Sequence, residues 1–402
     1  MSDSTFVPCP SVRSLHDILP QEPLLMMGAG PVPIPERVAK ANSVVINHLG
    51  DTMGTVIDQV KTMTRYVFQT RTPWVMGVAG PGSAAMEMAA ANLIEPGDAV
   101  LSLSNGFFSN RMAQMATRVG GIVTEINTPE KHAADPDWVR THLEKVKPKV
   151  LTMVHGETSN TVCNIHLKEI AKLAKEYDCL LVVDAICTLS TMPLKMDEWQ
   201  VDAVITGGQK GLSSIPGVSL LAFSELAWKK IKSRKSQIVQ WCLDAELAEN
   251  FWHKNGYHYT APVSGIMAIH EALKLVCEET IEVRFQRHLR CSLALQHGIE
   301  GMGLDLFIPT EQRLNSVVGI CLPDGITSNQ ICHHISHQHR VEIAGSFGQP
   351  IVRIGQMGEQ CREHNLFRAL HALGCTMREL GIKVDLPTGM AELESYLQSI
   401  AR

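Results

Sequence analysis

Three polar side chains follow apolar runs that are typical of buried β-strands. Lys210 ends "DAVITGGQK", Asp184 ends "CLLVVD", and Thr158 comes shortly after "VLTMV". In open α/β sheets, ligand sites collect at the carboxyl ends of the strands. Taken alone, Asp184 would be interpreted as a turn or helix-cap residue and Lys210 as a solvated loop residue. Their order and spacing, which leave room for one connection and one strand, favour a shared site.

An aspartate and a lysine in this arrangement suit one kind of chemistry. A carboxylate placed directly after four apolar residues carries a desolvation cost unless it meets a cation. The protonated ring nitrogen of pyridoxal 5′-phosphate is such a cation, and a lysine amine holds the aldehyde of that cofactor as a Schiff base. The same lysine then serves as a proton carrier. Asp184 and Lys210 therefore predict pyridoxal phosphate as the cofactor.

A phosphate group would sit at the start of a helix, where unpaired N–H groups and the helix dipole favour an anion. The stretch "VAGPGSAAMEMAAA" provides such a start, with Gly80 and Gly82 in a tight loop and Ser83 and Ala84 opening the helix. The stretch has neither the G-x-G-x-x-G of dinucleotide folds nor the G-K-[ST] of a P-loop, so alone it is a weak signal.

The flanking elements predict an α/β fold with a mostly parallel sheet. Apolar runs at 150–157 and 179–186 are long enough for strands buried on both faces, and 166–178 between them has helical spacing. Strand–helix–strand units in series indicate parallel strands flanked by helices. After residue 262 the pattern changes to a long helix at 263–279 and then to strands and helices without strict alternation, which indicates a smaller α+β domain.

The length of 402 residues favours two domains. We expect an N-terminal arm at 1–25, a large cofactor-binding domain at 26–275 and a small domain at 276–402. The helix at 365–380 and the apolar runs at 314–325, 340–347 and 350–358 fall in the small domain.

Five motifs in order resemble the class V aminotransferases of fold type I. They are "GPGSAAMEMA", "NGFFSNR", "HGETSNT", "PLKMDEWQVDAVITGGQKGL" and "VRIGQMG". Within that family the chain is most similar to alanine–glyoxylate and serine–glyoxylate (serine–pyruvate) aminotransferases, over roughly residues 24–380. The resemblance implies transfer of an amino group from alanine or serine to glyoxylate or pyruvate. It also implies a homodimer with shared active sites.

The resemblance also implies a role for each matched residue. Lys210 would form the Schiff base, Asp184 would pair with the ring nitrogen, and Arg353 would grip the α-carboxylate of the substrate. Phe108 would stack on the cofactor ring in place of the usual Trp or Tyr, and Thr158 would lie on the O3 side. The remaining implied contacts are Gly82, Ser83, Ala84 and Gln209 toward the phosphate, Tyr257 and Thr260 toward the phosphate of the other subunit, and Gly30 in the loop 28–33 that lines the substrate pocket.

Several departures from the family pattern bear on the substrate. Gly208 replaces a common serine, "SIPG" replaces Pro-Pro-Gly, and the short linker before Arg353 lacks the second arginine of pyridoxamine–pyruvate aminotransferase. The alternatives are a transaminase for an atypical amine such as pyridoxamine, a β-eliminating lyase or desulfurase, and a non-enzymatic protein with this fold. A desulfurase would use a mobile cysteine, but Cys321 falls in an apolar run and Cys332 in a helical stretch, so we expect both to be buried packing residues.

The charge, hydropathy and cysteine pattern of the sequence argue against nucleic-acid-binding, membrane-spanning and secreted proteins. A net charge of −5 gives no reason to expect nucleic acid, and the basic run 228–236 is typical of a solvated helix face. No apolar run approaches the length that spans a membrane, and no secretory signal is evident at the start of the chain. Eleven scattered cysteines without a C-x-x-C pair suit reduced thiols in a cytoplasmic protein. His333 and His337 could share a helical face, but an amphipathic helix explains the segment and we expect no metal site.

Overall fold

A seven-stranded sheet forms the centre of the larger of two bodies in the computed structural model, which describes residues 7–129 and 131–400. The strand order is β2–β10–β9–β8–β5–β3–β4, and every pairing is parallel except those of β10, which runs antiparallel to β2 and β9. The strands are β2 (Val75–Ala79), β3 (Ala99–Ser104), β4 (Ile122–Asn127), β5 (Val150–Val154), β8 (Leu180–Asp184), β9 (Ala203–Gly207) and β10 (Val218–Phe223). The mostly parallel sheet expected from the sequence is confirmed.

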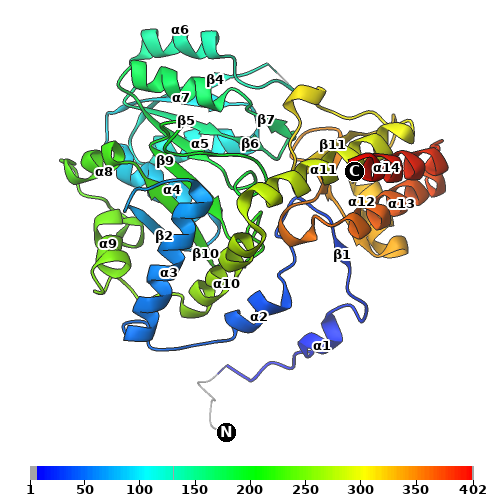
Figure 1. Ribbon diagram of the computed structural model, residues 1–402, viewed down its shortest axis with the longest axis horizontal. Helices are drawn as coiled ribbons and strands as arrows, with labels where there is room; N and C mark the ends of the chain where they lie inside the picture. The colour runs from blue at the N-terminus through cyan, green and yellow to red at the C-terminus, as the bar shows by residue number, and fades with distance from the viewer. Residues whose placement is uncertain (1–6, 130, 401–402) are drawn as a thin grey trace.

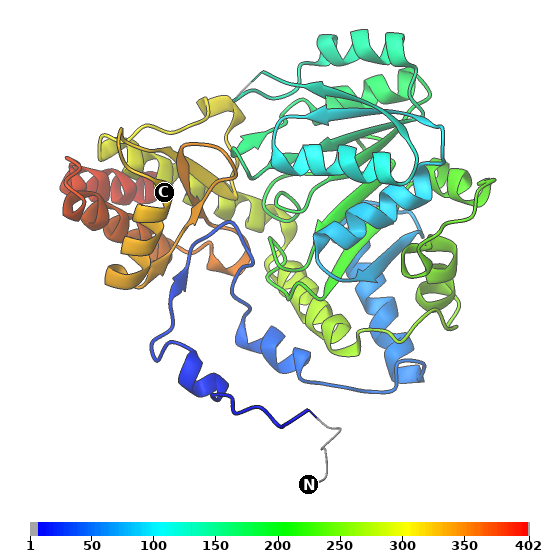
Figure 2. The same cartoon turned by 180° about the vertical axis from the view of Figure 1, so that it is seen from behind.

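Helices flank this sheet, as Figures 1 and 2 show from opposite sides. The predicted helix 263–279 coincides with α10, and the alanine-rich helix starts one residue earlier than expected, at Gly82. The helices of this body are α2 (Glu36–Asn42), α3 (Asp51–Phe68), α4 (Gly82–Leu93), α5 (Phe107–Arg118), α6 (Pro136–Val146), α7 (Leu167–Glu176), α8 (Glu225–Lys232), α9 (Ala245–His253) and α10 (Val263–Glu279), with a 3₁₀ turn η1 (Trp241–Leu243).

One predicted strand is shorter than its apolar run. The expected strand 150–157 ends at Val154, and the chain then turns into β6 (Gly156–Glu157), which forms a hairpin with β7 (Val162–Cys163) outside the main sheet. Asn164 stabilises this exit because its side chain donates to the carbonyl of Val154 at 2.6 Å. The turn carries the chain away from the sheet edge and places Gly156 and Thr158 in the wall of the cavity described below.

The smaller body combines a three-stranded antiparallel sheet, β11–β14–β13, with four helices (Figure 1, yellow to red). The run 340–347, expected to be a single strand, forms two short strands, because β12 pairs with β1 near the N-terminus whereas β13 pairs with β14. The elements of this body are β1 (Leu25–Met26), α11 (Ile281–Gly301), η2 (Thr310–Gln312), β11 (Val317–Cys321), α12 (Ser328–His339), β12 (Val341–Glu342), β13 (Ala344–Gly345), β14 (Ile351–Gly355), η3 (Gly358–Gln360), α13 (Glu363–Glu379) and α14 (Leu386–Ile400). The short helix α1 (Leu15–Ile18) has no buried residue and lies in the N-terminal segment that precedes β1.

Each body has its own hydrophobic core. One buried cluster extends from Met53 to Val276, and a second contains Met27 together with residues from Cys291 to Leu397. Between them Thr280 interrupts the helical path with a positive φ of 69°. We propose two domains that divide between α10 and α11, with the segment around Met27 returning to pack in the second. Among the described helices, none has both the length and the apolar composition that a membrane crossing requires.

Candidate active site

A cavity of about 230 Å³ opens at the carboxyl ends of β5, β8 and β9. Parallel strands place their ends at one edge of the sheet, so residues far apart in the sequence meet there. The sequence predicted seven of its lining residues, which are Gly82, Ser83, Phe108, Thr158, Asp184, Gln209 and Lys210. The others are Pro81, Met86, Arg111, Val154, Gly156, Ile186 and Cys187.

Lys210 follows the end of β9 in a turn and is itself partly buried. Its Nζ donates to the carbonyl of Ala29. Burial lowers the pKa of this amine, which increases the neutral, nucleophilic fraction. The neighbouring Gly30 has φ +100°, and a Cβ there would lie 2.5 Å from Lys210 Nζ. Only glycine leaves the lysine room to move, and the loop 28–33 lies against it although it is not part of the cavity wall.

Asp184 is the last residue of β8 and is 3% exposed. Its Oδ1 accepts a hydrogen bond from the N–H of Ile186 at 2.7 Å. Burial raises the pKa of the carboxyl to about 7, the charge of Glu157 adds to the rise, and the charges of Lys210 and Arg111 oppose it. A carboxylate buried in this way gains most from a cation inside the cavity, and a protonated ring nitrogen fits that need.

The anion-binding end of the cavity is the start of α4. The N-cap is Pro81, whose ring has no group that could accept the first N–H groups of the helix, so the N–H groups of Gly82 and Ser83 are available to an anion. The amide oxygen of Gln209 is buried there with no hydrogen-bond partner among the described residues. Ala84, by contrast, donates its N–H to Pro81 at 2.7 Å and does not line the cavity.

Arg111 is a cavity residue that the sequence analysis did not single out. It lies one turn after Phe108 on α5, and its Nη1 donates to Ser83 Oγ at 3.1 Å. Its guanidinium also lies over the rings of Phe107 and Phe108, 5.1 and 4.9 Å from their centroids. A cation next to Ser83 balances the charge of a phosphate at the helix start. The i, i+3 spacing between Phe108 and Arg111 within "FFSNR" is the sequence signal that could have placed Arg111 beside Phe108 at the site.

Glu157, also missed, fixes the position of Phe108. This fully buried carboxylate accepts hydrogen bonds from the N–H groups of Phe108 (3.1 Å) and Ser109 (2.9 Å) at the start of α5. It also accepts from the N–H of Ser159 at 3.1 Å. A carboxylate at a helix N-terminus is favoured by the helix dipole. Glu157 thereby holds the main chain of Phe108, whose ring the resemblance assigns to stacking on the cofactor.

Arg353 comes to the site from the smaller domain. It lies in the middle of β14, is 5% exposed, and donates to the carbonyls of Gly345 and Thr158. Burial lowers its pKa to about 10, so it stays charged at neutral pH. The ring of Phe347 lies 5.7 Å from its guanidinium and stacks on Phe107 at 4.5 Å. Arg353 is not part of the cavity wall itself but lies directly behind Thr158.

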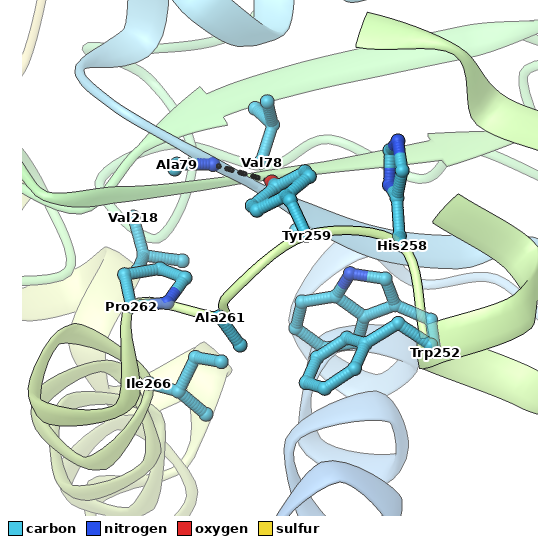
Figure 3. A pocket seen from close by; sticks show the side chains of 11 residues that line it. Val78, Ala79, Val218, Trp252, His258, Tyr259, Ala261, Pro262 and Ile266 are labelled. Carbon is cyan, nitrogen blue, oxygen red and sulfur yellow. Dashed lines mark hydrogen bonds between the residues drawn. The ribbon is translucent and has the colours of Figure 1, made fainter. Parts of the chain in front are cut away.

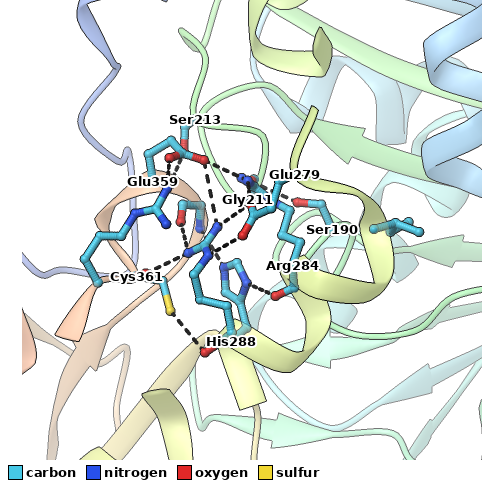
Figure 4. Close-up of polar contacts among 12 residues, drawn as sticks. Ser190, Gly211, Ser213, Glu279, Arg284, His288, Glu359 and Cys361 are labelled. Carbon is cyan, nitrogen blue, oxygen red and sulfur yellow. Dashed lines mark hydrogen bonds and ion pairs between the residues drawn. The ribbon is translucent and has the colours of Figure 1, made fainter. Parts of the chain in front are cut away.

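A polar network clamps the turn that follows Lys210 (Figure 4). Arg284, which is fully buried, donates to the carbonyl of Gly211 at 2.8 Å and to the carboxylates of Glu279 and Glu359 at 2.7 Å each. The N–H of Glu359 donates to Ser213 Oγ at 2.7 Å. The smaller domain therefore holds the main chain next to the lysine. No local pattern in the sequence marks Arg284, because its partners lie 5 to 75 residues away.

Two predicted residues lie away from the cavity of their own chain. Tyr257 is 58% exposed and Thr260 is also exposed. Between them, Tyr259 turns inward and its hydroxyl accepts from the N–H of Ala79, next to the loop that precedes α4 (Figure 3). The apolar pocket drawn there has a volume of only about 10 Å³, room for a single water. The segment 257–260 therefore braces the phosphate loop from behind while it presents two side chains outward.

The residues present fit pyridoxal phosphate. One wall offers a buried carboxylate, another a primary amine of lowered pKa, and the third a helix start beside an arginine. The amine suits an aldehyde, the carboxylate a protonated ring nitrogen and the helix start a phosphate.

Comparisons with known proteins agree with this geometry. The Aminotransferase class-V family model matches residues 36–363. An alanine–glyoxylate aminotransferase of Oryctolagus cuniculus is 35% identical over 359 residues, which cover 87% of this chain and 91% of that protein. The solved ureidoglycine–glyoxylate aminotransferase of Bacillus subtilis superposes with a TM-score of 0.91 at 31% identity, covering 94% of this chain and 99% of that one. Pyridoxamine–pyruvate aminotransferase of Mesorhizobium loti, at 24% identity, 95% and 99% coverage and a TM-score of 0.90, shares the fold.

The match extends well beyond half of the chain, so both the resemblance and the fold class expected from the sequence are confirmed. This chain belongs to the class V aminotransferases, the pyridoxal-phosphate-dependent transaminases of fold type I.

Proposed function

We propose that this enzyme transfers the amino group of a small amino acid, alanine or serine, to a small 2-oxo acid, glyoxylate or pyruvate. The observation that carries the proposal is that Lys210 and Asp184 line one cavity, while Arg353 lies directly behind its wall and donates to the carbonyl of Thr158. Alanine–glyoxylate and ureidoglycine–glyoxylate aminotransferases among the relatives favour glyoxylate as the acceptor.

Each residue has one task in this reaction. Bound pyridoxal phosphate supplies an electron sink for the electron pair left on the α-carbon. Lys210 would hold the aldehyde of the cofactor through its amine and, as a free amine, would accept and return the proton of the substrate α-carbon. Asp184 keeps its negative charge toward the ring nitrogen, and Arg353 holds the α-carboxylate with its planar donor fork.

A desulfurase-type lyase has less support from the thiols near the site. Cys321 ends β11 and Cys332 lies in α12, and neither lines the cavity. Cys187 does line the cavity, but burial raises its pKa strongly and its Sγ donates to the carbonyl of Gly156 at 3.1 Å. A buried, protonated thiol is a poor nucleophile. Transamination therefore remains the better proposal.

Half-reactions with single substrates test the proposal. Purified enzyme with alanine or serine alone should convert its cofactor to the pyridoxamine form in one turnover, and glyoxylate or pyruvate should reverse the change. A lyase would turn over continuously without an acceptor. The panel should include (S)-ureidoglycine and pyridoxamine as donors, because relatives are named for them. Exclusive use of one of these two would contradict the assignment of alanine or serine.

Arg353→Lys separates substrates that carry an α-carboxylate from those that do not. Loss of the bidentate contact should raise KM for alanine and glyoxylate by about 10-fold or more, since a hydrogen bond to a charged group contributes about 1.5–3 kcal/mol. A donor without a carboxylate, such as pyridoxamine, should be affected far less. An equal effect on both kinds of donor would mean that Arg353 acts on the fold and not on the carboxylate.

We also propose that the active site is completed by a second copy of the chain. The support is the outward position of Tyr257 and Thr260, which the family resemblance places at the phosphate of the other subunit. Lys210→Ala and a Tyr257→Ala/Thr260→Ala double variant should each be weakly active. After mixed refolding, one intact site per hybrid dimer should restore about one quarter of the normal activity. Failure of the mixture to exceed its parents, with hybrid dimers verified, would contradict a shared site.

The cysteines support a cytoplasmic location. All eleven are free thiols in the structure, including the buried Cys163, Cys179 and Cys187. Thiols in such number persist where the environment is reducing. We therefore place the reaction in the cytoplasm, which fractionation of the native cells would test.

A further inference from the structure

Three potential metal ligands converge where two helices of the smaller domain end. His334 and His339 lie in the second half of α12, and Glu379 is the last residue of α13. Glu379 Oε2 accepts from Nε2 of His334 at 2.6 Å and from Nε2 of His339 at 3.0 Å. All three ligand atoms lie within 4.8 Å of one another. Two imidazoles thus point their ring nitrogens at one carboxylate oxygen.

Two imidazole nitrogens and one carboxylate oxygen are a typical ligand set for Zn²⁺ and related transition-metal ions. Mg²⁺ and Ca²⁺ prefer sites built from oxygen alone. In the structure the Nε2–H groups both donate to Glu379. A cation would replace these two protons, and each ring nitrogen would have to move away from the carboxylate oxygen by less than about 1 Å to reach tetrahedral spacing. The partly exposed position leaves the fourth site to water.

The neighbouring histidines do not offer the same geometry. The rings of His333 and His337, the pair that helical spacing singles out, stack with centroids 4.0 Å apart and planes 21° apart. The lone pair of a ring nitrogen lies in the plane of its ring, so two stacked rings direct these lone pairs side by side and not toward one point. In addition, His337 uses Nδ1 to donate to the carbonyl of His333 at 2.8 Å.

We propose that His334, His339 and Glu379 form a binding site for a divalent transition-metal ion of the zinc class. The ion would tie the end of α12 to the end of α13. Because α12 packs on β13 and on β14, which carries Arg353, the tie would brace the domain that presents this arginine. None of the three ligands lines the cofactor cavity, so the inference is independent of the proposed reaction.

Calorimetric titration of the cofactor-loaded enzyme with Zn²⁺ tests the site. His334→Ala and Glu379→Gln should each weaken Zn²⁺ binding by about 10-fold or more, since the loss of even an outer-shell partner costs 10- to 100-fold. The double variant His333→Ala/His337→Ala removes two histidines from the same helix and should bind as tightly as the unchanged enzyme. Zn²⁺ should also raise the melting temperature of the unchanged enzyme but not that of Glu379→Gln.

Three results would overturn the site. They are Zn²⁺ binding that survives in His334→Ala and Glu379→Gln, equal loss in the His333/His337 control, or a preference for Mg²⁺ over Zn²⁺. All variants keep the cofactor cavity and the cysteines, so zinc bound at either place contributes equally to every titration and does not imitate the expected pattern. Failure here would leave the transaminase assignment untouched, because that assignment is tested by half-reactions.

Discussion

Replacing Lys210 by alanine is expected to remove transamination and the visible absorbance of the lysine-bound cofactor together. The amine is the group that joins the cofactor aldehyde and the group that carries the proton, and its lowered pKa suits both tasks. General acid–base catalysis alone contributes about 10²–10⁴-fold, so kcat should fall by at least that factor. Absorbance spectra and single-turnover kinetics of the purified variant provide the measurement.

Two further variants make the Lys210 result specific. Lys210→Arg retains a long cationic side chain but has no primary amine, so it should lose the absorbance and the activity as Lys210→Ala does. Lys195→Ala removes a half-exposed lysine that pairs with Glu198 at 2.8 Å, and it should behave like the unchanged enzyme. A normal visible spectrum in Lys210→Ala would rule out the assigned role.

Replacing Asp184 by asparagine should have opposite effects on the loaded and the cofactor-free protein. In the loaded enzyme the ring nitrogen loses its anionic partner. Breaking a buried ion pair costs about 3–5 kcal/mol, which corresponds to about 10²–10⁴-fold in cofactor affinity or in kcat. The cofactor dissociation constant should therefore rise, and kcat should fall.

In the cofactor-free protein the same substitution should increase stability at alkaline pH. Burial raises the pKa of Asp184 from 3.8 to about 7, so the folded state binds the proton more tightly than the unfolded state does. Stability therefore falls as pH rises from about 4 to about 7, and the full penalty, of about 4 kcal/mol, is present above pH 7. Asparagine has no such charge, although its buried amide costs about 1–3 kcal/mol if unpaired.

Thermal melting at several pH values separates these effects. The cofactor-free Asp184→Asn variant should melt above the unchanged cofactor-free protein at pH 8, and the advantage should disappear below pH 4. Asp202→Asn is a matched control, since Asp202 is equally buried but pairs with Lys175 just before β9 begins, at the opposite end of the strand. It should destabilise the protein without weakening cofactor binding. An Asp184→Asn variant with normal cofactor affinity would contradict the pairing with the ring nitrogen.

Local signals were sufficient for the main elements of the site. Apolar runs ending in Asp184 and Lys210 predicted two strand ends at one edge of a sheet, because a strand buried on both faces must be apolar and the parallel arrangement aligns the carboxyl ends. The Gly-Pro-Gly turn before alanine-rich sequence predicted a helix that starts at Ser83, one residue after its actual start at Gly82. These features depend on neighbours within a few residues, so they can be predicted from the local sequence.

Contacts between segments that are distant in the sequence could not be predicted from local patterns. The run 150–157 is typical of one strand, but the strand ends at Val154, whose carbonyl accepts a hydrogen bond from the side chain of Asn164. Arg284, Arg111 and Glu157 take their roles from partners that only folding brings near, namely Gly211, Ser83 and the start of α5. Helical spacing likewise pointed to His333 and His337, whereas the convergent pair is His334 and His339.

The sequence by itself determined the chemistry of this protein, meaning the cofactor, the lysine, the aspartate and the sheet edge where they meet. Its hydrophobic pattern and its strand-end residues act locally, and the burial of apolar runs leaves few ways to arrange them. The tertiary structure decided which charges balance one another across the two domains and which carbonyls Arg353 and Arg284 hold. Those pairings depend on side chains that meet only after the cores have formed, since hydrogen bonds need atoms within about 3 Å and no sequence period encodes such distances.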